Sequence, residues 1–131
     1  MPEFTHFDAS GNACMVNVSD KQETVRQATA AGTVTMSRQA YDMVRQGSVK
    51  KGDVLGVARI AGLMAAKKVD QLIPLCHPLA ITGADIAFSF NYAQAAIEIE
   101  ATVSISGKTG VEMEALTAVS VAALTIYDMC K

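Results

Sequence analysis

The sequence lacks the features that mark secreted, membrane-spanning or nucleic-acid-binding proteins. Its three cysteines, Cys14, Cys76 and Cys130, are odd in number and far apart, which fits neither a disulfide framework nor paired zinc ligands. The 11 basic and 13 acidic residues are interspersed, so the formal net charge is only -2 and no basic stripe is available to bind a polyanion. No signal-peptide pattern opens the chain, and charges interrupt its most apolar stretches before they reach membrane-spanning length. We therefore expect a cytoplasmic protein with reduced thiols that binds neither nucleic acid nor a membrane.

The chain has the size of one globular domain. Its 131 residues are 50% apolar, which is enough to bury a single continuous core. The sequence contains no internal repeats and no low-complexity tracts. We therefore predict one domain over residues 1–131.

Two kinds of pattern predict strands. Residues 24–36 are rich in β-branched side chains, and Gly32 within this run suggests a bulge. Apolar and polar residues alternate with a period of two over 86–92 and again over 97–105. The link 93–95 between these two runs is short, so we predict that they pair as a hairpin.

Helix signals occupy much of the remaining chain. Ser37 is placed to cap a short helix that Gly47 ends. Asp53 is placed to cap a second helix, which runs from Val54 to about Val69. A last long helix begins after residues 107–110 and continues to the end of the sequence.

Two of these helices are apolar on almost every side. Residues 54–66 and 115–126 are rich in alanine and other small or apolar residues all the way round. A helix of this kind has to be buried on more than one side. Since one layer of helices over one sheet would leave the outer faces wet, we predict contacts between subunits through those faces.

A loop with two prolines is the first candidate for a binding site. Pro74 and Pro78 exclude a helix and fix an ordered loop around Cys76 and His77. Rigid polar loops often hold binding sites, whereas a histidine bonded only to nearby backbone is the plainer alternative. A metal site has less support, because Cys76 and His77 would need ligands from a second cluster that the sequence does not contain.

Two further segments carry lysines beside helix starts. Lys50 and Lys51 precede the helix that Asp53 is expected to cap, where backbone donors favour an anion such as phosphate. A solvated loop with a capping aspartate explains the same residues equally well. Residues 107–110 read Gly-Lys-Thr-Gly but lack the earlier glycine of a P-loop, because position 102 is threonine. We retain only a general anion site there.

Two glutamates at the start of the last helix have different explanations. Thr109 and Glu112 have the spacing of a capping box, which accounts for Glu112 without any role in catalysis. Glu114 has no such structural duty, so it remains a candidate for chemistry.

A carboxylate and an ammonium group meet at the end of the same helix. Asp128 and Lys131 are three residues apart, so they share one helix face and can pair. A surface ion pair contributes only about 0 to 1 kcal/mol to stability. In a partly desolvated interface, however, the two groups can tune each other's proton affinity for catalysis.

These residues stand in longer motifs that resemble the MoaC family. The resemblance covers nearly the whole chain, and its motifs are long and specific. They are Thr5-His6-Phe7-Asp8, Lys51-Gly52-Asp53-Val54, Ala58-Arg59-Ile60-Ala61-Gly62, Ile73-Pro74-Leu75-Cys76-His77-Pro78-Leu79, residues 107–117 and Thr125-Ile126-Tyr127-Asp128-Met129-Cys130-Lys131.

The resemblance implies a fold, an assembly and an activity. The fold is α+β and ferredoxin-like, with an antiparallel sheet packed against helices. The assembly is a homohexamer built from three dimers, with active sites at the dimer interface. The activity is that of a lyase in molybdenum-cofactor biosynthesis, which converts (8S)-3',8-cyclo-7,8-dihydroguanosine 5'-triphosphate to cyclic pyranopterin monophosphate and pyrophosphate.

The resemblance also assigns roles to residues. It makes Asp128 the catalytic acid and base, with Lys131 and Lys51 as its cationic partners. It implies that the substrate is contacted by residues of two other motifs. These are Leu75, Cys76 and His77 of the two-proline loop and Met113 and Glu114 of residues 107–117. The family continues past residue 131 with a strand and a tail that supplies another active-site lysine, so we expect the chain as given to be less active than a longer form.

The expected chemistry needs proton transfer and cations. Lysines near the triphosphate offset the charge of the leaving pyrophosphate, and Asp128 with Lys131 can move protons. No redox step is implied, so no cofactor is required, although magnesium could accompany the substrate phosphates without protein ligands. The alternative is a non-catalytic oligomeric module that binds a nucleotide or pterin phosphate, but such a module has no need for a proton-transfer pair.

Overall fold

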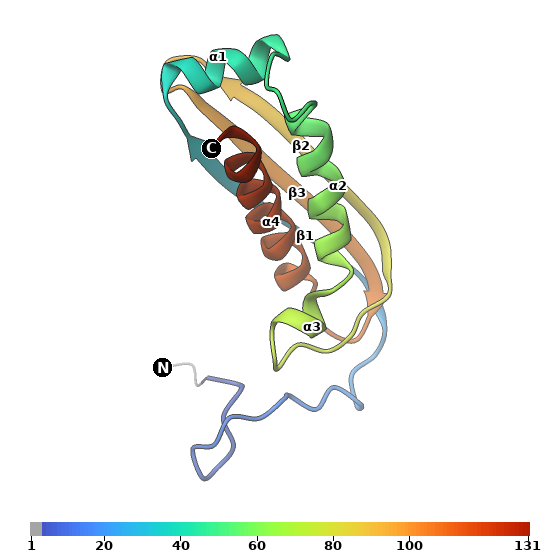
Figure 1. Cartoon of the computed structure of the whole chain (residues 1–131). Helices are drawn as coiled ribbons and strands as arrows, with labels where there is room; N and C mark the ends of the chain where they lie inside the picture. The colour runs from blue at the N-terminus through green and yellow to red at the C-terminus, as the bar shows by residue number, and fades with distance from the viewer. Residues whose placement is uncertain (1–3) are drawn as a thin grey trace.

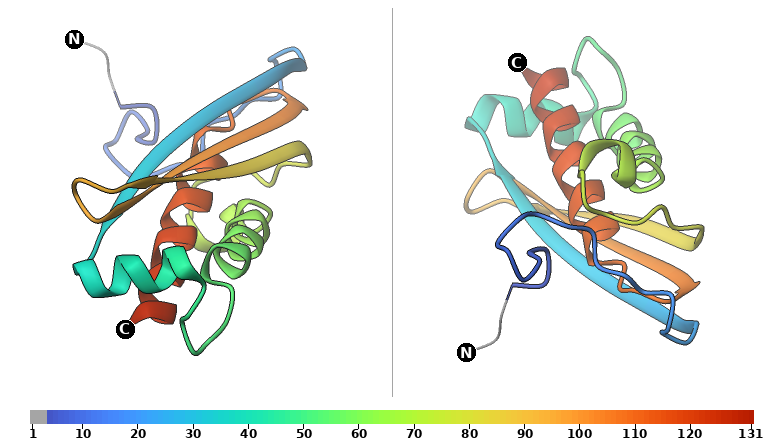
Figure 2. Two further views of the ribbon diagram at one scale, coloured as in Figure 1. Left: turned by 90° about the horizontal axis from the view of Figure 1, so that it is seen from above. Right: turned by 90° about the horizontal axis from the view of Figure 1, so that it is seen from below.

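The chain folds as one sheet covered on one side by helices. The computed structural model describes residues 4–131. Its elements in chain order are β1 (Thr24–Thr35), α1 (Arg38–Gln46), α2 (Val54–Ala66), α3 (Val69–Leu72), β2 (Ile81–Asn91), β3 (Ala96–Gly107) and α4 (Glu112–Cys130). The three strands are antiparallel in the order β1-β3-β2, and the helices lie along the same face of the sheet (Figures 1 and 2). The predicted α+β class, with an antiparallel sheet packed against helices, is confirmed.

The central strand β3 carries the core of the sheet. Its alternate residues Ile97, Ile99, Ala101, Val103 and Ile105 are at most 1% exposed, whereas Glu98 and Glu100 point to the opposite face and are exposed. The period-two pattern therefore gave the correct inner face. The predicted hairpin is also confirmed, because β2 pairs directly with β3.

The predicted bulge at Gly32 is wrong. Gly32 pairs with Ile99 in an unbroken register between β1 and β3, and the only register shift of the sheet lies between Ile81 and Gly83 of β2, within the described residues. The reason for glycine at this position is the helix above it. A Cβ atom on Gly32 would lie 2.7 Å from Cγ1 of Val119 on α4.

Helices α2 and α4 pack closely because small residues line their contact. Ala58, Gly62, Ala118 and Ala122 are all buried between them. A Cβ atom on Gly62 would lie only 2.9 Å from the carbonyl oxygen of Ala118, so the two backbones approach as far as this glycine allows. Both helices are thereby fixed over the sheet.

Helix boundaries follow the predicted caps in two cases. The Ser37 hydroxyl accepts a hydrogen bond from the amide of Ala40, and Gly47 ends α1 with φ of 72°. The Asp53 carboxylate likewise accepts from the amide of Gly56. Helix α2 ends at Ala66, however, which is earlier than predicted.

The predicted capping box at the start of α4 is wrong. The N-cap residue is Val111, and it makes no side-chain cap hydrogen bond. Glu112 is therefore the first helical residue, whereas a capping box needs glutamate at the third. Thr109 lies two residues before the cap, so it is out of place for the reciprocal bond.

The outer faces of α2 and α4 remain exposed in the single chain. Ile60 and Met64 on α2 and Leu116, Leu124 and Tyr127 on α4 are between 48% and 66% exposed. Helix α4 is long and apolar enough to cross a membrane by length and composition, but its inner face packs on β1 and β3. The exposed apolar faces are the ones expected to meet another subunit.

Candidate active site

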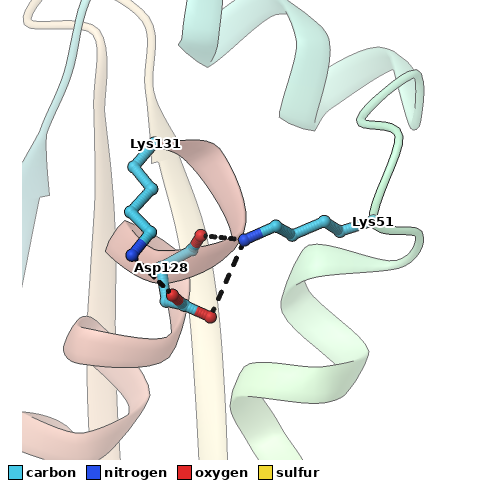
Figure 3. Close-up of polar contacts among 3 residues, drawn as sticks. All are labelled: Lys51, Asp128 and Lys131. Atoms are coloured by element: carbon cyan, nitrogen blue, oxygen red, sulfur yellow. Dashed lines mark hydrogen bonds and ion pairs between the residues drawn. The ribbon is translucent and has the colours of Figure 1, made fainter.

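The C-terminal turn of α4 brings one carboxylate and two ammonium groups together. Nζ of Lys131 lies 3.2 Å from Oδ1 of Asp128, which confirms the pair predicted from their spacing. Nζ of Lys51 lies 3.9 Å from Oδ2 and donates a 2.7 Å hydrogen bond to the backbone carbonyl of Asp128 (Figure 3). Both lysines therefore approach one aspartate from different parts of the chain.

Lys51 reaches the helix end from the loop between α1 and α2. Its neighbour Gly52 has φ of 110°, a backbone conformation that side-chain-bearing residues rarely adopt. The last carbonyls of a helix have no partner within the helix and carry partial negative charge. The ammonium group of Lys51 satisfies one of these carbonyls and stabilises the negative end of α4.

A cavity of about 410 Å³ opens beside this cluster. It is bounded by α1, by the loop before α2 and by the end of α4, and three of its lining residues are lysines, namely Lys50, Lys51 and Lys131. Polar side chains of Ser37 and Gln39 also line it. The rest of the wall is largely apolar, with Ala40, Met43, Val49 and Met129. The three ammonium groups at its edge suit the phosphates of a ligand.

A second cluster lies at the other end of α4. Leu75, Cys76 and His77 of the proline-containing loop face Met113 and Glu114 across a cavity of about 90 Å³. The structure therefore brings together all five of the residues predicted to contact substrate. Within residues 4–131, no group of three or more His, Cys, Asp or Glu side chains is arranged to hold a metal ion.

Glu114 is the unusual residue of this second cluster. Its side chain is only 4% exposed. Burial raises the pKa of its carboxyl group above the ordinary value, and the nearby charges of Glu112 and Asp70 raise it further. The pKa of the Cys76 thiol is raised as well, first by burial and then by Glu114 and Glu112. Negative charge is therefore disfavoured in this cavity, in contrast to the lysine-rich end.

The two clusters are held apart by the helix that carries both. Glu114 and Asp128 are fourteen residues apart on α4, which corresponds to about 20 Å at 1.5 Å per residue. The two cavities share no lining residue. One small substrate cannot contact both clusters within one chain.

Comparison with known sequences decides the family. The sequence model of the MoaC family matches residues 15–131. The chain belongs to the MoaC family. It is 60% identical to the cyclic pyranopterin monophosphate synthase of Heliobacterium modesticaldum over 131 residues, which are 100% of this chain and 82% of that protein.

Other relatives of this MoaC chain carry the same name. The cyclic pyranopterin monophosphate synthase of Desulfitobacterium hafniense is 60% identical over 129 residues, which are 98% of this chain and 78% of the relative. That of Clostridium perfringens is 57% identical over 129 residues, 98% of this chain and 82% of the relative. The resemblance expected from the motifs is confirmed over the whole sequence.

The structure adds site residues that the sequence argument did not assign. His6 and Glu112 line the cavity of the second cluster. Glu112 has the sequence spacing of a capping-box residue but lines the cavity instead, so its spacing gave no signal for this position. His6 stands in a motif that marked the family, but only folding shows that the N-terminal segment reaches this cavity.

Proposed function

We propose that this member of the MoaC family catalyses the reaction for which its relatives are named, the formation of cyclic pyranopterin monophosphate. The substrate is the cyclised guanosine triphosphate, and pyrophosphate leaves. The observation that carries the proposal is Asp128, which has Lys131 at 3.2 Å and Lys51 at 3.9 Å beside a cavity lined by three lysines. A pure binding module needs the lysines but not a carboxylate held between two of them.

The phosphates belong at the lysine-rich end of the site. Lys50, Lys51 and Lys131 can offset charge that develops on the departing pyrophosphate. The cavity at Glu114 suits the ring system instead, because buried and acidic surroundings would repel a phosphate, whereas acceptor groups match the ring N–H donors. This difference in charge between the two cavities orients the substrate, with its phosphates at the lysines and its ring system at Glu114.

Asp128 is positioned to transfer protons. Its two carboxylate oxygens face different ammonium groups, so a proton accepted by one oxygen leaves the other still paired. Lys131 can return a proton during ring closure, as general acid and base act in turn. These three residues therefore form the proposed catalytic centre.

Two copies of the chain complete one site in this proposal. The proposed dimer packs the exposed faces of α2 and α4 of the two copies together about a two-fold axis perpendicular to α4. The same surface then serves both subunits, and the two α4 helices run antiparallel. The Asp128 end of one copy then meets the Glu114 end of the other. The exposed apolar residues Ile60, Leu124 and Tyr127 are the groups that such packing would cover.

Assembly of three such dimers into a hexamer is the expected quaternary structure. Light scattering tests it directly, with an expected mass of six 13.8 kDa chains. A stable monomer at micromolar concentration would end the shared-site proposal.

No organic cofactor is required by the proposed reaction, and magnesium is expected to enter only with the phosphate oxygens. Elemental analysis of protein purified without added metal should find no stoichiometric zinc at the Cys76 and His77 loop. Cell fractionation tests the expected cytoplasmic location.

The decisive experiment is turnover of (8S)-3',8-cyclo-7,8-dihydroguanosine 5'-triphosphate. Pyrophosphate release and formation of the cyclic phosphate should appear together in equal amounts. Tight binding of this compound without release of pyrophosphate would support the binding-module alternative instead.

A further inference from the structure

The N-terminal segment forms a small ordered hairpin beside the second cavity. Phe7 and Ala13 form an isolated antiparallel bridge, and Gly11 turns the chain with φ of 82°. The Asp8 carboxylate accepts hydrogen bonds from the amides of Ser10 and Asn12, both at 2.9 Å. Several mutually consistent bonds therefore define the conformation of this turn.

His6 lies at the base of this hairpin, and one of its ring nitrogens is already engaged. The amide of Cys14 donates to the carbonyl of His6 at 2.8 Å, and Nδ1 of the His6 ring lies 3.2 Å from the carbonyl of Cys14. A carbonyl oxygen can only accept, so Nδ1 carries a hydrogen and donates it. In the neutral ring Nε2 is then the unprotonated nitrogen, with a free lone pair.

The surroundings of the His6 ring point to a ligand. Its side chain lines the same cavity as His77, Met113 and Glu114, although these residues are more than sixty positions away in the sequence. The ring is also solvent-exposed in the single chain, so nothing in the described structure blocks its approach to a small molecule. Nε2 is the nitrogen left to meet that molecule.

We infer that His6 is a further substrate-contacting residue, whose Nε2 accepts a hydrogen bond from a ring N–H of the bound substrate in the cavity shared with His77 and Glu114. This inference rests on the proposed function. It extends the site to the N-terminal hairpin, which orients the imidazole through Nδ1 and the Cys14 carbonyl. The hairpin thus contributes to recognition of the ring system, at the end of the site remote from the lysines.

Two substitutions separate the two ring nitrogens. In His6→Asn, the amide nitrogen can take the place of Nδ1 and keep the bond to Cys14, but the acceptor at the Nε2 position is lost. In His6→Gln, the longer amide can reach the Nε2 position and accept a hydrogen bond there, but the Nδ1 donor is lost. Ser10→Ala is the matched control, because the Ser10 side chain is not among the residues that line the cavity.

The readout is steady-state turnover of the cyclised triphosphate, with KM and kcat measured separately. Loss of one hydrogen bond should raise KM of His6→Asn about 10-fold while kcat changes little. Ser10→Ala should keep KM close to that of the wild type. His6→Gln should raise KM clearly less than His6→Asn, because it keeps the acceptor although it loses the bond to Cys14.

The outcomes distinguish this inference from the proposed function. If the wild-type protein does not turn over the substrate, the proposed function fails. If it does, equal KM values in His6→Asn and His6→Gln overturn the role of Nε2, whether both are normal or both are raised. A larger defect in His6→Gln than in His6→Asn assigns His6 to holding the hairpin and also overturns it.

Discussion

Mixing two inactive variants provides a direct test of a site shared between subunits. Asp128→Asn removes the proton acceptor at one end of α4, and His77→Ala removes the imidazole that lines the cavity at the other end. Each variant alone has one damaged component in every site. Because the proposed site takes its Asp128 end from one subunit and its His77 end from the other, a mixed dimer contains one site that is intact and one that carries both defects.

The magnitude of the recovery follows from counting subunits. With equal co-expression and random pairing, half of the dimers are mixed, and half of the sites in those dimers are intact. The mixture should therefore reach about one quarter of the wild-type turnover per site, since a two-fold interface pairs the subunits in this way. The count is the same for isolated dimers and for three dimers in a hexamer.

A second mixture serves as the control. Asp128→Asn and Lys131→Ala damage the same end of α4, where the two side chains lie 3.2 Å apart. Every site in a mixture of these variants contains one damaged lysine-rich end, so no recovery is expected. Pyrophosphate release is the assay for both mixtures. No recovery in the first mixture, or equal recovery in both, would refute a site built from two subunits.

Three further predictions concern single positions. Asp128→Asn should lower kcat on the order of 10²- to 10⁴-fold while stability changes by at most about 1 kcal/mol, as measured by turnover and urea unfolding. Gly62→Ala should destabilise the protein by about 1 to 3 kcal/mol in urea unfolding, because the new methyl group overpacks against the Ala118 carbonyl. Glu114→Gln should flatten the dependence of stability on pH. The pKa of Glu114 is higher in the folded than in the unfolded protein, so protonation of this carboxyl group stabilises the fold. This stabilisation is fully present below the unfolded-state pKa of Glu114 and is lost as pH rises through its folded-state pKa. Glutamine does not titrate, so the loss should be absent in the variant.

Each of these predictions has a result that contradicts it. Near wild-type turnover of Asp128→Asn would remove that residue from the catalytic centre. Gly83→Ala is the control for Gly62→Ala, since its Cβ would meet only an ordinary contact at 3.9 Å, and equal effects of the two substitutions would argue against overpacking. If Glu114→Gln leaves the dependence of unfolding free energy on pH unchanged, burial does not raise the pKa of the Glu114 carboxyl group.

Much of the local structure could be predicted because short-range chemistry determines it. The alternation over 97–105 identified the inner face of β3, since successive side chains of a strand point to opposite faces. Ser37 and Asp53 predicted the starts of α1 and α2, because their side chains accept hydrogen bonds from amides three residues later. The pair of Asp128 and Lys131 followed from helical spacing for the same reason.

Local patterns failed where a different part of the chain decides the conformation. Gly32 resembles a bulge in isolation, but the helix packed above it is the reason for its small size. Thr109 and Glu112 have the spacing of a capping box, yet the helix begins at Glu112, with Val111 buried against the core as its N-cap. The burial of Val111 was not visible in the spacing alone.

By itself, then, the sequence determined the three strands, the longer helices, the family and most of the chemical groups of the candidate site, whereas the short helix α3 and the places of His6 and Glu112 were not predicted. Their arrangement was decided only by tertiary structure, because contacts between distant residues depend on how the helices pack over the sheet. Lys51 reaches Asp128 across 77 positions only when the loop before α2 lies beside the end of α4. Glu114 becomes a buried carboxyl group, and His6 its neighbour in one cavity, only when the proline loop and the N-terminal hairpin fold around the start of α4.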